Sequence, residues 1–195
     1  MQEATAQSVL GDFGRKRFSH AGTTSTFFRR DGRFYVNTDG PDGRPADFEI
    51  KYTFGVTPLQ QYLVAFPGGR LQALPIAWDA RPKSQGGQRW FHLYPGQRIT
   101  PRDPLHWTRL NQNWNWMCAD CHSTDLRRNY DSASDSFKTA WSEINVSCEA
   151  CHGPGSAHAA WANKAPGWRS MANLGLEVAQ LGHGLVGQAA QRLGL

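Results

Sequence analysis

All four cysteines of the 195-residue chain fall in two copies of one short pattern, Cys-x-x-Cys-His, at residues 118–122 and 148–152. Two thiols three positions apart on a helical turn can add to the two vinyl groups along one edge of a porphyrin. The histidine after the second thiol can then give its imidazole nitrogen to the iron. The pattern predicts two covalently attached haem c groups. The expected thioether anchors are Cys118, Cys121, Cys148 and Cys151, and the expected iron ligands are His122 and His152.

Two other uses of four cysteines remain as alternatives. Cys-x-x-Cys pairs also build structural zinc sites, so a zinc-stabilised binding module with four thiolate ligands is one of them. The stretch between Cys121 and Cys148 is longer than most zinc ribbons use, and zinc needs no histidine after both pairs. Disulfides within the pairs would constrain the chain little and would leave the histidines unexplained. The histidines therefore favour haem.

A low-spin haem iron also needs an axial ligand on its second face. His158 is too close in sequence to His152 to reach the far face of the same haem, so we expect it to bind the iron of a neighbouring haem. His106, on a predicted helix before the first motif, is the other candidate. His20 and His92 lie in predicted strands and are expected to be ordinary polar or packed residues.

The elements that must position these motifs begin with an antiparallel β region at residues 18–100. Its β-prone runs lie at 27–36, 48–54, 61–66, 70–74 and 89–94. Asp31-Gly32 divides the first run, and Pro67-Gly68-Gly69 separates the third from the fourth, so each predicts a hairpin. The second run alternates with period two, which is typical of a half-buried strand.

From residue 103 the pattern changes. Asp103-Pro104 is a good helix start, because a capping side chain precedes proline at the first helical position. Helices are expected near 104–111, 115–123, 139–152 and 156–163. The predicted fold class is therefore α+β, with a small antiparallel sheet in the N-terminal half and a helical, loop-rich haem-binding half.

The expected organisation has four parts. They are an N-terminal segment at 1–17, the antiparallel β region at 18–100, a dihaem cytochrome c region at 101–165, and a poorly ordered tail at 166–195. The tail is rich in glycine, which costs about 1 kcal/mol per residue against alanine in a helix.

Composition limits the classes of partner. The formal net charge is +5, but the lysines and arginines are scattered and form no basic run, so nucleic acid is not an expected partner. No apolar run approaches the length that spans a bilayer. The N-terminus shows no signal peptide, although covalent haem attachment normally takes place outside the cytoplasmic membrane.

Several stretches around the motifs carry a resemblance to a known family. They are 114–117 and 123–124 around the first motif, 148–155 at the second, and 52–55, 58–63 and 77–79 upstream. Together they resemble multihaem cytochromes related to the electron acceptor of hydroxylamine oxidoreductase, over roughly residues 9–165. Many such proteins are exported and carry tetratricopeptide repeats behind the haem part.

The resemblance also implies neighbours for this chain. Members usually have a further Cys-x-x-Cys-His motif upstream, and commonly another downstream, of the matching region. We therefore expect this chain to be an internal portion of a longer, periplasmic or otherwise exported protein, next to other haem modules.

The predicted function is electron transfer between redox partner proteins, as a carrier rather than a catalyst. The alternative enzyme is a multihaem reductase of a small nitrogen or sulfur oxyanion, which would need one iron with an open position. Arg109, Arg127 and Arg128 could serve such an anion, but solvated surface is the simpler interpretation.

Overall fold

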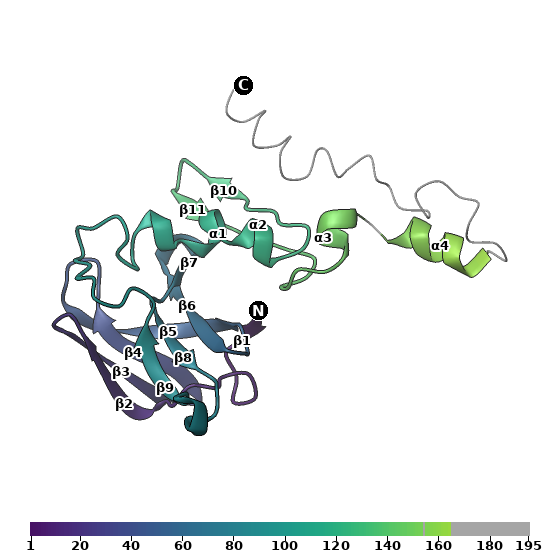
Figure 1. Ribbon diagram of the computed structural model, residues 1–195. Helices are drawn as coiled ribbons and strands as arrows, with labels where there is room; N and C mark the ends of the chain where they lie inside the picture. The colour runs from purple at the N-terminus through teal and green to yellow at the C-terminus, as the bar shows by residue number, and fades with distance from the viewer. Residues whose placement is uncertain (154, 165–195) are drawn as a thin grey trace. The chain divides into compact units, whose positions relative to one another are not determined.

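The computed structural model describes residues 1–153 and 155–164, and it is mostly β, with 39% strand and 17% helix. The predicted α+β class is therefore wrong: a nearly closed, barrel-like antiparallel sheet dominates, and the described residues contain only four short α-helices (Figure 1). The chain forms two compact units. One comprises Met1–His122 with Leu126–Ala140, and the other Ser123–Asp125 with the described residues from Trp141 onward.

The sheet belongs to the first unit, and its strands pair in the order β2-β3-β4-β5-β6-β8-β9, with β1 added to β5 and β7 to β6. All the strand pairs are antiparallel. The bounds are β1 Gln2–Glu3, β2 Gly14–His20, β3 Thr23–Arg30, β4 Arg33–Asp39, β5 Pro45–Phe54, β6 Leu59–Phe66, β7 Arg70–Ala73, β8 Ile76–Asp79 and β9 Arg89–His92.

Both predicted hairpins are confirmed. Strands β3 and β4 meet at Asp31 and Gly32, whose φ angles of 51° and 75° suit the tight turn that joins twisted antiparallel strands. Strands β6 and β7 pair across the 3₁₀ turn Pro67–Gly69. The predicted strand at 48–54 lies within β5.

The core of the barrel is aromatic. Phe13, in the segment before β2, has its ring edge-on to four other rings at centroid distances of 5.1–5.6 Å. These rings belong to Phe27, Phe34, Tyr62 and Trp90, all of them buried. Aromatic pairs in this geometry contribute roughly 0.5–1.5 kcal/mol beyond the apolar area they bury. The first unit thus has its own core.

The two ends of the strand order approach each other at a seam. His20 of β2 stacks on His92 of β9 with ring centroids 3.9 Å apart and planes 8° from parallel. Burial, and then the neighbouring His20, lower the pKa of His92 below its ordinary value. Both histidines lie in strands, as the sequence predicted, and they pack against each other.

Helices are short. They are α1 Trp114–Met117, α2 Ala119–His122, α3 Glu149–His152 and α4 Ser156–Lys164, with 3₁₀ turns at Lys83–Gln85 and Leu110–Gln112 and a small hairpin of β10 Tyr130–Asp131 and β11 Ser136–Phe137. No helix in the described part of the chain is long and apolar enough to cross a bilayer. The predicted tail at 166–195 lies outside the described residues.

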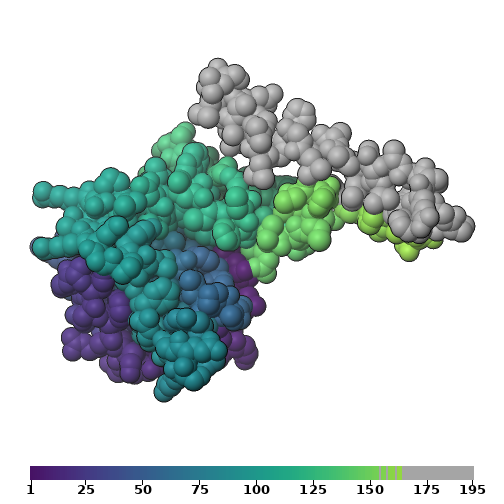
Figure 2. Space-filling view, in the orientation of Figure 1, coloured from purple at the N-terminus to yellow at the C-terminus, as the bar shows by residue number. Residues whose placement is uncertain are grey.

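Two of the predicted helices are wrong. Residues 104–111 form successive tight turns, because the Trp107 indole N–H donates to the Asp39 carbonyl (2.9 Å) and the Gln72 amide donates to the Trp107 carbonyl (2.8 Å). These bonds fasten the segment to the barrel. In 139–152 only α3 is helical, since Ala140 and Glu143 form isolated β-bridges. In the face shown in Figure 2, the teal residues that follow the early strands lie beside and above the blue and purple ones.

Candidate functional site

The first Cys-x-x-Cys-His motif follows a helix that the barrel holds in place. The side chain of Asn113 caps α1 by accepting a hydrogen bond from the Trp116 N–H at 3.0 Å. Its amide also donates to the Gln72 side chain on β7 at 2.8 Å, and the two residues form a β-bridge. Side chains with this geometry satisfy backbone donors that the first helical turn leaves open.

Asn115 makes the second attachment of α1 to the barrel. Its side-chain oxygen accepts from the Leu71 N–H at 2.7 Å, and its amide donates to the Gly69 carbonyl at 3.2 Å and to the Thr139 hydroxyl at 2.9 Å. The residue is 1% exposed. Since Trp114, also in α1, is buried as well, one side of this helix packs against the barrel.

The motif itself forms one helical turn that faces solvent. The Cys121 N–H donates to the Cys118 carbonyl at 3.1 Å, so the two thiols lie on the same turn. Cys118 is half-buried, whereas Cys121 and His122 are exposed. Burial, and then the neighbouring Cys121, raise the pKa of the Cys118 thiol. The Phe54 ring at the end of β5 lies 6.2 Å from the His122 ring, centroid to centroid.

Large apolar side chains stand exposed next to this motif. Trp116 is 47% and Met117 54% exposed, although both directly precede Cys118. Soluble proteins do expose single apolar residues, but two such side chains beside paired thiols and an imidazole form a surface suited to a flat apolar ligand. This donor set and its surroundings fit a covalently attached haem.

The second motif, in the second unit, repeats the geometry. The N–H groups of Cys151 and His152 both donate to the Cys148 carbonyl, at 3.3 and 3.0 Å. All three side chains are exposed. The turn ends at Gly153, whose φ of 73° suits glycine at the end of a helix. Val146, two positions before the motif, is an exposed apolar residue. These residues therefore fit a haem in the same way.

Thr124 organises the chain in front of the second motif. Its backbone exchanges hydrogen bonds with Ser142 and Glu143, and its hydroxyl donates to the Asn145 carbonyl at 2.8 Å and accepts from the Ser147 N–H at 2.9 Å. Thr124 is buried. One residue therefore fixes the irregular segment that leads into Cys148.

The structure places His106 against the barrel. Its Nε2 lies 3.1 Å from the Asp39 carboxylate and its Nδ1 lies 2.9 Å from the Thr108 hydroxyl. The side chain is 3% exposed. Both ring nitrogens are thus engaged, and His106 offers none to an iron in this conformation.

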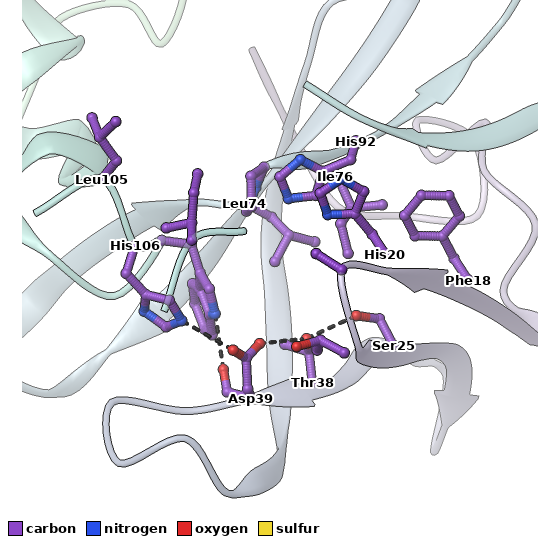
Figure 3. Close-up of a pocket in the computed structure, with 15 residues that line it drawn as sticks. Phe18, His20, Ser25, Thr38, Asp39, Leu74, Ile76, His92, Leu105 and His106 are labelled. Carbon is purple, nitrogen blue, oxygen red and sulfur yellow. Dashed lines mark hydrogen bonds and ion pairs between the residues drawn. The ribbon is translucent and has the colours of Figure 1, made fainter. Parts of the chain in front are cut away.

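Figure 3 shows the cavity that His106 borders, with His20 and His92 on another side and Asp39 joined to Thr38. Its volume is about 50 Å³. Pockets for drug-sized ligands start near ~300 Å³, so this cavity is too small to hold a haem.

The remaining predicted ligand, His158, lies in α4 and is partly exposed. Its role as the ligand of a neighbouring haem stays a prediction. Over residues 1–153 and 155–164, no three His, Cys, Asp or Glu side chains converge into a group able to hold a metal ion.

Several residues that position the site were not among those predicted from the sequence. They are Gln72, Asn113, Asn115 and Thr124, all of them buried. The alternating Asn-Trp-Asn-Trp of 113–116 carries a readable signal, since asparagine before an apolar helix start is a preferred cap. Gln72 and Thr124 show no such local signal, because their partners lie far away in the chain.

Comparison with known families agrees with this geometry. Residues 102–153, which contain both motifs, match the model of the family described as cytochrome c554 and c-prime. Comparison with curated proteins and with solved structures found no match. The matched segment is similar to c-type cytochromes, and the match supports haem binding through covalent attachment and a role in electron transfer.

Proposed function

We propose that this chain is an electron-transfer module of a multihaem cytochrome c, and that it carries two covalently attached haems. The observation that carries the proposal is the same in both units: two thiols and an imidazole stand together on one short helical turn open to solvent. Such a turn can present its thiols to the vinyl edge of a porphyrin and its histidine to the iron. Bound haem would supply an iron that accepts and donates one electron at a time.

Each residue then has a defined role. Cys118, Cys121, Cys148 and Cys151 form the thioethers, and His122 and His152 bind the irons. Thioether attachment keeps a haem in place where the protein covers little of it, which agrees with the exposure of both turns. His158 is proposed as the second ligand of a neighbouring haem.

The barrel acts as the scaffold for the first haem. Gln72, Asn113 and Asn115 connect it to α1, so the position of the Cys118–His122 turn is fixed by buried hydrogen bonds. Phe54 and Trp116 supply apolar contact beside it. Packing and buried hydrogen bonds of this kind hold a site in one geometry, which suits a carrier.

The proposed setting follows from this chemistry and from the family resemblance. Haem is attached outside the cytoplasmic membrane, so we propose a periplasmic or otherwise exported location. Proteins related to the electron acceptor of hydroxylamine oxidoreductase contain further haem motifs, and neighbouring haem modules with redox partner proteins are the proposed partners. The similarity of residues 102–153 to cytochromes c554 and c-prime supports this setting.

A pyridine haemochrome spectrum of the denatured full chain, made in a host that attaches haem in its periplasm, tests the proposal. We expect about two covalent c-type haems per chain. The double variants Cys118→Ala/Cys121→Ala and Cys148→Ala/Cys151→Ala should each lose one haem.

Histidine variants provide the matched comparison. His122→Ala should change the iron spectrum, whereas His20→Ala, at the barrel seam, should not. No covalent haem, with about one zinc per chain instead, would overturn the proposal in favour of a zinc-stabilised module. A high-spin iron whose spectrum shifts with nitrite would favour the reductase interpretation over the electron carrier.

A further inference from the structure

Arg128 contacts the first motif from outside it. Its guanidinium forms an ion pair with the carboxylate of Asp120, one of the two residues between Cys118 and Cys121. Its Nε also donates to the Asn115 carbonyl at 3.2 Å, and the group lies over the Trp116 ring, 5.2 Å from the centroid. One cation therefore touches both α1 and α2.

The arginine half of this ion pair is sheltered, whereas the Asp120 side chain is 49% exposed. The Arg128 side chain is 19% exposed, and exposed pairs contribute only about 0–1 kcal/mol because water and salt screen them. Here the guanidinium is held by a carboxylate, a carbonyl and an indole face together. The Arg128 carbonyl in turn accepts from the Thr139 hydroxyl at 3.1 Å, and that hydroxyl accepts from Asn115. The cation is thus fixed by the same network that fixes the motif.

A fixed charge at this place has an electrostatic consequence. Reduction adds one electron to the haem, so a nearby cation stabilises the reduced state and a nearby carboxylate the oxidised state. Asp120 is a carboxylate inside the motif itself. With Arg128 in place the pair is close to neutral, whereas without it the motif would carry an uncompensated negative charge.

We infer that Arg128 is a positioning residue of the first haem site, which holds the Cys118–His122 turn and keeps the reduction potential of that haem high by neutralising Asp120. The inference rests on the proposed function. It assigns this task to Arg128 because Arg128 contacts Asp120, the Asn115 carbonyl and the Trp116 ring, and the exposed neighbour Arg127 offers a control for the charge alone.

The test uses the full chain with Cys148→Ala/Cys151→Ala, so that only the first haem is titrated spectroelectrochemically. Arg128→Gln should make reduction about tenfold less favourable, a downward shift of about 59 mV for one electron. Arg128→Lys, which keeps the charge, should recover most of the shift. Arg127→Gln removes the same charge one residue away and should give less than half of it.

Asp120→Asn gives a result of opposite sign, because it removes the carboxylate and leaves the cation. We expect its potential to rise above that of the parent, an outcome that loss of structure alone does not produce. If Arg128→Gln fails to retain haem, the potential of Asp120→Asn still tests whether the charge of Asp120 influences the haem. Equal potentials in Arg128→Gln and Arg127→Gln, or a fall in Asp120→Asn, would overturn the inference. Absence of covalent haem from the parent would overturn the proposed function instead.

Discussion

Replacing Asn115 with alanine removes the side chain that joins α1 to the barrel. Three hydrogen bonds disappear, and their partners are the backbone N–H of Leu71, the carbonyl of Gly69 and the hydroxyl of Thr139. Leu71 is buried on β7, so its N–H loses a 2.7 Å bond with little water to replace it. The hydroxyl still has the Arg128 carbonyl as a partner.

The expected cost follows from the two backbone groups that lose their partner. Only the Leu71 N–H is buried, because Gly69 is exposed and its carbonyl can bond to water instead. A buried donor without a partner costs about 1–3 kcal/mol, so we expect a loss of roughly 2 kcal/mol in the free energy of unfolding. Domains of this kind are stable by about 5–15 kcal/mol, so the loss is a large share.

Urea unfolding of the full chain, followed by far-ultraviolet circular dichroism, measures this loss as a lower midpoint with an unchanged slope. Asn111→Ala is the matched control, because Asn111 is exposed and lies four residues earlier. We expect the control to change stability by less than about 0.5 kcal/mol. In haem-loaded protein, Asn115→Ala should lower the haem occupancy of the first motif, whereas the second motif should keep its haem. A midpoint equal to that of the control would refute the role given to Asn115.

Three further predictions concern other parts of the chain. Gly69→Ala should destabilise the protein by about 2 kcal/mol more than Gly86→Ala in urea unfolding, since both have positive φ but only at Gly69 would the new carbon overlap a backbone carbonyl; equal costs would contradict this. The Arg81 guanidinium holds the pKa of Asp79 at about 2, below its ordinary 3.8, so the pair stabilises the fold fully above about pH 4 and not at all below pH 2. Asp79→Asn should therefore lower the Tm at pH 7 but leave it unchanged near pH 2, and an equal loss at both pH values would show that the charge is not the cause. Thr124→Val should lower haem occupancy at the second motif alone, as counted on haem peptides by mass spectrometry, and a loss at the first motif would argue against a local role.

The strands of the barrel were predictable where the signals were local. Asp31-Gly32 requires positive φ at both positions, and the run at 48–54 forms a strand, so both features appear in the structure as expected. The alternation of the strand is broken by a register shift between Ile50 and Tyr52, after which Thr53 is buried instead of Tyr52. The fold class was not predicted. No local pattern indicates that β2 returns to β9, because the contact between His20 and His92 joins residues far apart in the chain.

In the segment after residue 103 the local signal was present, but the structure did not follow it. Asp103-Pro104 carries a sound helix-start signal, yet the segment forms tight turns because Trp107 and its carbonyl bind the barrel. Tertiary hydrogen bonds with buried partners outweigh helix propensity, which differs by less than about 1 kcal/mol per residue among ordinary residues. His106 belongs to the same segment, and its Nε2 lies 3.1 Å from the Asp39 carboxylate of the barrel. Its role as an iron ligand stays a prediction.

The sequence by itself determined the chemistry that each motif can perform. The spacing of two cysteines and a histidine is a property of five consecutive residues, and a single helical turn is enough to bring them together. Only the tertiary structure decided what holds those turns and which charges lie beside them, since Gln72, Asn115 and Arg128 reach their partners across the fold. Covalent geometry is local, whereas buried hydrogen bonds and charges depend on which distant residues the folded chain brings within about 3 Å of one another.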